Sequence, residues 1–225
     1  MQAVLFWKTW LKKVTMYGCF MLVFVCLLYA NALHYAKVIA VNTSFSFVVK
    51  KCDNVAVGGF ETEQIGGAGY SITVGGATYV AVGVYDSYSV AQNIAQSLGE
   101  TYLVHTLQAN DLYFTTKEQK KNAAIYVGAL SSLNGCMQVL SQEIIRLDNG
   151  ATQNSSRHVV QDLYNQFAYL GETYKNMYPP FSQVCKESAN ELLLIGEDII
   201  YAQKLRRLQC ALSVEYCQLC KEFLP

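Results

Sequence analysis

Residues 78–98, TYVAVGVYDSYSVAQNIAQSL, contain the clearest strand-to-helix pattern in the chain. Residues 78–85 alternate valine with small or aromatic side chains, which predicts a strand whose two faces differ. Asp86 and Ser87 follow, and short polar side chains at such a point are good N-caps for a helix. That helix is predicted over 88–98, because apolar residues recur there at helical spacing: Val90, Ala91, Ile94, Ala95 and Leu98.

The sequence on either side continues the same alternation of strands and helices. We predict further strands over 44–50, 70–74 and 101–107, and a short, poorly amphipathic helix over 55–65. Gly75-Gly76 between two strands indicates a two-residue hairpin turn. The order is βαββαβ, which is typical of a ferredoxin-like split βαβ domain over 42–110.

Residues 117–223 are expected to be helical. Three helices are predicted, over 117–147, 155–176 and 182–223, with breaks at Gly150 and at Pro179-Pro180. Short connections make neighbouring helices antiparallel, so we expect a three-helix bundle that folds without the sheet module. The predicted fold class is therefore α+β: a ferredoxin-like βαββαβ domain followed by an antiparallel three-helix bundle.

The N-terminus contains a long apolar segment, residues 14–33, without a charged side chain. A helix of this length crosses about 30 Å of hydrocarbon, and the lysines Lys8, Lys12 and Lys13 all precede it. By the positive-inside rule, residues 1–41 are a cytoplasmic basic tail and a single-pass transmembrane anchor. The rest of the chain is then extracytoplasmic.

A cleaved signal peptide is the alternative, since Ala30-Asn31-Ala32 has the small-x-small pattern of a cleavage site. The retained anchor is favoured because the apolar stretch continues past Ala32. In both cases the remainder of the chain is exported.

Composition and charge narrow the classes of function. Hydrophobic residues make up 52% of the chain, enough for a core, and the formal net charge is zero. Without a basic balance or patch, no nucleic-acid partner is expected. Cys217 and Cys220 form the only closely spaced cysteine pair outside the apolar segment, and no histidine lies near enough to complete a zinc site. No metal and no cofactor is predicted, and the pair is interpreted as helix packing with an optional disulfide.

The strand and helix of 79–98 resemble those of the SPOR (sporulation-related repeat) family, whose half-repeat is an aromatic-led strand ending in Val-x-Val-Gly-x-aromatic, a polar cap and a helix with spaced Ala and Leu. The resemblance covers about 65 of the 225 residues. In the first half, Lys51-Cys52-Asp53 stands where a glycine and an aromatic residue are usual. The resemblance implies binding of peptidoglycan glycan strands, typically at division or sporulation septa, without catalysis.

Strand alternation then suggests where a glycan could bind. If Val80, Val82 and Val84 face the two helices, the opposite face of the sheet is left open for an extended polysaccharide. The candidate glycan-binding residues on the strands are Tyr79, Ser71, Thr73, Tyr85, His105 and Lys50.

No enzyme signature is found. His34, His105 and His158 lie in different segments, away from any cysteine or carboxylate pair that would form a catalytic or metal site. The glycine pairs lack the Gly-Lys-Ser/Thr ending of a phosphate loop. Together with the SPOR resemblance, which implies glycan binding, this predicts a non-enzymatic protein of a Gram-positive-type cell envelope that binds glycan strands. The alternative is a membrane-anchored interaction or assembly scaffold, with a protein partner or a second copy bound through the helical bundle.

Overall fold

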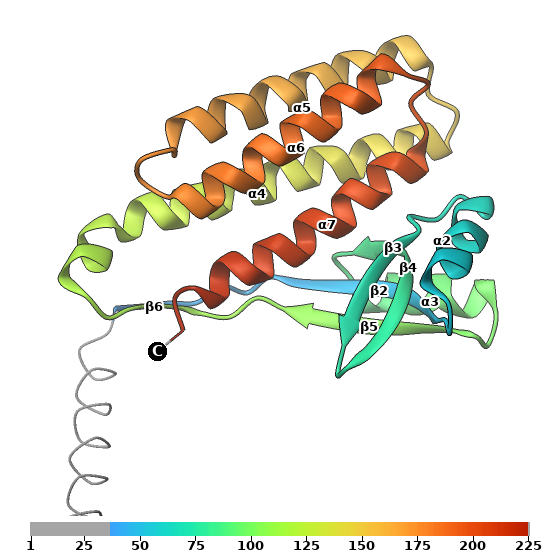
Figure 1. Ribbon diagram of the computed structural model, residues 1–225, viewed down its shortest axis with the longest axis horizontal. Helices are drawn as coiled ribbons and strands as arrows, with labels where there is room; N and C mark the ends of the chain where they lie inside the picture. Colours follow the sequence, from blue (N-terminus) through green and yellow to red (C-terminus); the bar gives the residue numbers. More distant parts are fainter. Residues whose placement is uncertain (1–36, 225) are drawn as a thin grey trace, which may run out of the picture.

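The computed structural model describes residues 37–224, and the predicted anchor at 14–33 lies outside them. Within the described residues the fold is mixed α and β, with six helices and two antiparallel sheets (Figure 1). The α+β class is confirmed at this level.

The larger sheet has four antiparallel strands in the order β3-β4-β2-β5. They are β2 (Ser44–Lys51), β3 (Tyr70–Val74), β4 (Ala77–Tyr85) and β5 (Tyr102–Gln108). Gly75 and Gly76 form the β3–β4 turn at φ of 58° and 78°, a conformation that glycine adopts without strain. The register between β2 and β4 shifts at Val48/Val49, which marks a β-bulge.

One face of this sheet is covered by α2 (Val55–Gln64) and α3 (Tyr88–Leu98). The side chains of Asn54 and Ser87 cap the two helices by accepting hydrogen bonds from backbone amides of the first turn. Small residues allow both helices to lie close to the strands. The cluster beneath α3 consists of Val48, Val82, Ala91 and Ala95, and α2 meets the sheet through Gly58 and Gly59.

The helical part contains four helices, so the prediction of three is wrong. They are α4 (Lys117–Asp148), α5 (Gln153–Thr173), α6 (Pro179–Glu197) and α7 (Ala202–Lys221). The predicted helix over 182–223 breaks at Asp198, whose carboxylate accepts a hydrogen bond from the Ile199 amide. The Gln153 side chain bonds both the N–H and the C=O of Ile200, and these contacts replace the helical bonds at the break. As Figure 1 shows, α7 then runs back antiparallel to α6.

The second face of the large sheet is covered by α7, so the prediction of an open face is also wrong. Phe45, Phe47 and Val49 of β2 point toward α7, and the Phe45 ring meets the Tyr216 ring edge-on at 5.6 Å. One continuous hydrophobic core includes these residues together with Leu133, Phe167 and Leu205 of the bundle. The sheet and the bundle are therefore packed as one unit (Figure 1).

A second, two-stranded sheet joins the start of the described chain to the start of the bundle. β1 (Lys37–Ile39) pairs antiparallel with β6 (Leu112–Phe114), and Lys37 is opposite Phe114. The sequence did not predict this sheet, because β1 lies inside the predicted 1–41 segment. The Tyr113 amide also donates a hydrogen bond to the Phe223 carbonyl, which ties the end of α7 to β6.

Among the described residues, α4 alone is long and apolar enough to cross a membrane by length and composition. It packs against α5 and α7, and its apolar positions, including Leu133 and Leu140, are core residues of the bundle. Bundle packing is sufficient to account for its composition.

Candidate functional site

The six residues predicted to bind glycan do not lie on one face of the sheet. Tyr79 and His105 are on the side that α7 covers, where Tyr79 packs against the shared core. Lys50, Ser71, Thr73 and Tyr85 belong to the side that carries α2 and α3. The structure therefore separates the predicted set into two groups.

The pair on the bundle side is engaged within the protein. The rings of Tyr79 and His105 meet edge-on with centroids 4.6 Å apart, and His105 is opposite the fully buried Phe47. The Nε2 atom of His105 is buried and has no hydrogen-bond partner among the described residues. Both side chains are only partly exposed, and Tyr79 packs against the shared core.

The group on the helix side is dispersed. The Lys50 ammonium lies 2.9 Å from a carboxylate oxygen of Glu61 in α2, and this hydrogen bond raises the pKa of Lys50. Tyr85 packs against the cluster beneath α3, and burial raises the pKa of its hydroxyl. Ser71 and Thr73 are exposed on the edge strand β3. These four residues are spread over β2, β3 and β4.

An open groove lies between α3 and the edge strand β5, with a volume of about 330 Å³. That volume is within the range of small-molecule sites. Gly99 ends α3 at a φ of 115°, which turns the chain directly into β5 and sets the two elements side by side. We call this hollow the α3–β5 groove; it is lined by Tyr88, Gln92, Ala95, Gln96, Gly99, Glu100, Tyr102, Leu103 and Val104.

The lining of the α3–β5 groove combines apolar and hydrogen-bonding groups. Buried Ala95 and half-buried Val104 form its base, and Tyr88 is 55% exposed. Gln92 and Gln96 follow Tyr88 at intervals of four, so the three side chains form one stripe along α3. The spacing of Tyr88, Gln92 and Gln96 is visible in the sequence, but strand alternation does not reveal it because the stripe is on the helix.

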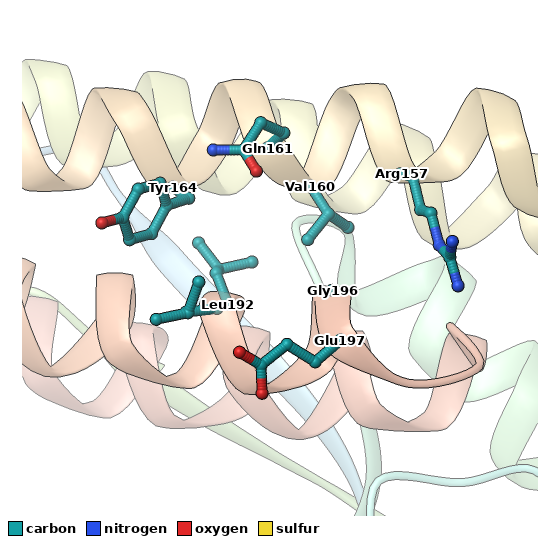
Figure 2. Close-up of a pocket in the computed structure, with 8 residues that line it drawn as sticks. Arg157, Val160, Gln161, Tyr164, Leu192, Gly196 and Glu197 are labelled. Atoms are coloured by element: carbon teal, nitrogen blue, oxygen red, sulfur yellow. The ribbon is translucent and has the colours of Figure 1, made fainter.

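A smaller hollow lies between α5 and α6, with a volume of about 160 Å³. Figure 2 shows Val160 and Leu192 between the two helices, with Arg157, Gln161 and Glu197 around them. This volume is below the usual range for ligand pockets. The hollow is better explained as a seam between two packed helices.

The Cys217–Cys220 pair is on the buried side of α7. Burial raises the pKa of the Cys217 thiol to about 11 and that of Cys220 to about 12, so both are protonated at neutral pH. The described cysteines form no disulfide with one another, and no cluster of His, Cys, Asp or Glu in residues 37–224 could hold a metal ion. For this pair, the structure supports the packing interpretation.

A patch of large apolar side chains is exposed where α6 meets α7. We call it the distal patch; its members are 43–67% exposed and are Leu193, Leu194, Ile199 and Tyr201. The nearby start of α7 is tied to the sheet module, since Arg206 donates a hydrogen bond of 2.6 Å to the Gly66 carbonyl. Exposed groups of large apolar side chains are typical of interaction surfaces.

Comparison with known proteins gives no match to a family model, to a curated protein or to a solved structure.

Proposed function

We propose that this chain is a non-enzymatic, membrane-anchored protein of the cell envelope that binds glycan strands of peptidoglycan in the α3–β5 groove. Residues 14–33 are the single-pass anchor in this proposal, and the described part of the chain is extracytoplasmic. The observation that carries the proposal is the mixed lining of the groove, in which tyrosine rings lie beside side-chain amides.

The chemistry of the groove suits a polysaccharide. Sugar rings present apolar faces that pack on tyrosine, while their hydroxyl groups pair with amide and carboxylate groups such as those of Gln92, Gln96 and Glu100. Because β5 is an edge strand, the groove runs along an open side of the sheet and can admit a long chain. A site of this kind needs no nucleophile, general base or metal.

The topology adds support for the SPOR resemblance. The βαββαβ order and the strand order β3-β4-β2-β5 fit the ferredoxin-like module that the SPOR resemblance implies. The groove is formed by the same half-repeat, 79–98, together with the strand that follows it. The proposed site therefore moves from the covered sheet face to the helix–strand edge of the same module.

The proposal is tested by sedimenting the full-length protein with insoluble peptidoglycan, before and after removal of stem peptides. We expect binding to both, and stronger binding to stripped material. Tyr88→Ala and the double variant Gln92→Ala/Gln96→Ala should each weaken binding about fivefold, the effect of losing about 1 kcal/mol of stacking or hydrogen bonding. Tyr169→Ala is the matched control, because Tyr169 is 70% exposed on α5, away from the groove.

A folded wild-type chain that does not sediment with peptidoglycan would reject glycan binding. Equal losses for the Tyr88 and Tyr169 variants would reject the groove as its location. A role at division or sporulation septa further predicts that a fluorescent fusion concentrates there, and uniform membrane fluorescence would contradict it.

A second candidate function, assembly with a protein partner or another copy, is favoured by the distal patch. Leu194 is 67% exposed, and Leu193, Ile199 and Tyr201, close to it along the chain, are 43–50% exposed. In this case a photo-crosslinking residue at position 194 should capture a discrete adduct in cells, whereas the same residue at exposed position 118 of α4 should not. Equal, diffuse labelling from both positions would argue against a docking site.

A further inference from the structure

The described chain begins at one end of the molecule, beside the start of the bundle. Lys37 is the first residue of β1 and is opposite Phe114 of β6, and α4 begins at Lys117. The end of α7 is held at the same place by the hydrogen bond from the Tyr113 amide to the Phe223 carbonyl. Figure 1 shows β6, the start of α4 and the end of α7 together at this end.

Five lysines are carried by these elements. Lys117, Lys120 and Lys121 are at i, i+3 and i+4 of α4 and so share one side of its first turns. Lys37 and Lys221 add positive charge from β1 and from the last turn of α7. None of the five forms an ion pair with a carboxylate in residues 37–224. We call this set the lysine face.

The acids near the lysine face do not balance it. Glu118 and Glu222 are exposed, and Asp111 is engaged in accepting a hydrogen bond of 2.9 Å from the Val41 amide. At the nearby α5–α6 turn, Glu172 pairs with both Lys175 and Lys186. Five lysines against three carboxylates leave this end positive, although the formal net charge of the whole chain is zero.

The lysine face is mounted on a rigid support. Aromatic rings from β6, from α4, from the residues just after α7 and from the turn before α6 pack together with centroids 5.0–6.0 Å apart. The rings are those of Phe114, Tyr126, Tyr178 and Phe223. These rings hold together the elements that carry the lysines.

The proposed anchor brings this face close to the membrane. Only residues 34–36 separate Lys37 from the end of the 14–33 segment, and four Cα-to-Cα steps span at most about 14 Å. The headgroup layer itself extends about 5–7 Å beyond the hydrocarbon. Lys37 therefore lies within about one Debye length of the headgroups, close enough for attraction that salt does not screen out.

We infer that the lysine face binds anionic phospholipid headgroups and thereby holds the described domain against the membrane in one orientation. This inference rests on the anchor of the proposed function and adds a second, electrostatic contact to it. In that orientation the distal patch, at the opposite end of the bundle, is directed away from the bilayer (Figure 1).

The test uses full-length protein reconstituted into nanodiscs of phosphatidylcholine alone or with 30% phosphatidylglycerol. Hydrogen–deuterium exchange of peptides covering 110–122 should be at least about threefold slower with the anionic lipid, and 0.5 M NaCl should remove the difference. Lys117→Gln/Lys120→Gln/Lys121→Gln should lose the slowing. The control Lys51→Gln/Arg157→Gln/Lys204→Gln removes three positive charges from elsewhere and should retain it.

The possible results distinguish a failure of lipid binding by the lysine face from a failure of the proposed membrane anchor. If the chain enters nanodiscs but its exchange is the same in both lipids, or if both triple variants behave alike, lipid binding by the lysine face is overturned and the anchor stands. If the chain stays outside nanodiscs, the anchor fails. Sedimentation of that soluble chain with phosphatidylglycerol vesicles then tests whether the lysine face binds anionic lipid. Binding lost only in the Lys117/Lys120/Lys121 variant supports it, and no binding overturns it.

Discussion

The two faces of the four-stranded sheet are buried by different means. On the α2–α3 face the contacts are made by small residues, including Gly58, Ala91 and Ala95, and the helices lie close to the strands. On the other face Phe45 and Phe47 reach into a core that continues through the helical bundle. The first face belongs to the sheet module alone, whereas the second joins the module to the rest of the protein.

This difference limits where a ligand can bind. A sheet covered on both faces offers no broad platform to a polysaccharide, and the remaining accessible places are its edges and the margins of its helices. The α3–β5 groove is such a margin, which is why the proposed site is there. We therefore expect substitutions on the bundle side to destabilise both the sheet and the bundle, and substitutions on the α2–α3 side to act mainly on the sheet module.

The largest effect is expected from Phe47→Ala. Phe47 is fully buried on the bundle side, and truncating such a residue costs about 3–5 kcal/mol in lost transfer free energy and cavity formation. Because the core is shared, the melting of sheet and bundle should shift together in a single calorimetric transition. Val82→Ala on the other face should cost about 1.5 kcal/mol, roughly 0.8 for each buried carbon removed.

Two separate transitions, with only one shifted by Phe47→Ala, would show that sheet and bundle are independent domains. The sequence-based expectation that 117–223 folds alone would then hold. The structure argues against it, since the isolated bundle would expose the surface of α7 that meets β3 and β4.

On the α2–α3 face we expect intermediate changes in the free energy of unfolding, with opposite signs at the adjacent residues Gly58 and Gly59. A Cβ at Gly58 would lie 2.3 Å from the Cys52 Sγ and 2.9 Å from its Cβ, so Gly58→Ala forces α2 away from the strands. We expect a loss of about 1–2 kcal/mol after the gain in helix propensity. At Gly59 the nearest atom is the Gly69 carbonyl oxygen at 3.5 Å, an ordinary contact.

Gly59→Ala should therefore stabilise the protein by about 0.5–1 kcal/mol through helix propensity alone. Urea denaturation of the two variants measures both numbers. Equal destabilisation at the two positions would mean that α2 is packed as tightly at Gly59 as at Gly58, and a Gly58→Ala protein as stable as wild type would mean that α2 does not contact the sheet closely through Gly58.

The sheet module is the part that the sequence predicts best. Each strand and helix from β2 to β5 begins and ends within one residue of its prediction, because caps, glycine turns and alternation all mark the same boundaries. The side of the sheet to which each side chain points was harder to predict. The bulge at Val48/Val49 changes the alternation, so Val82 faces α3 while Val84 faces the bundle core.

The features that the sequence missed depend on contacts between distant residues. The break between α6 and α7 depends on Gln153 bonding the backbone of Ile200, 47 positions away. The β1–β6 pair joins residues more than 70 positions apart, and its first strand is continuous with an apolar segment that reads as membrane anchor. Local pattern cannot reveal either. The cover of α7 over the sheet, which displaces Tyr79 and His105 from the candidate site, is also a long-range contact.

The smallest expected change in stability comes from the ionisation of one carboxyl group on the bundle side of the sheet, that of Glu191. Glu191 of α6 is half-buried near Tyr70 and Arg207, and burial raises the pKa of its carboxyl, with Arg207 acting in the opposite direction. A raised folded-state pKa favours the protonated acid. This contribution to stability is therefore fully present below the ordinary carboxyl pKa, and it is lost as pH rises through the raised value. Glu191→Gln mimics the protonated form and should raise the melting temperature by about 1–2 °C at pH 7.

At pH 4 the same Glu191 variant and the wild type should melt alike, because the native carboxyl is then largely neutral. Exposed Glu187 on the same helix is the control, and Glu187→Gln should change little at either pH. A destabilised Glu191→Gln protein at pH 7 would mean that the electrostatic attraction between Glu191 and Arg207 outweighs burial. Electrostatic attraction at the edge of the bundle-side face would then stabilise the contact between sheet and bundle, in addition to the buried aromatic residues of β2.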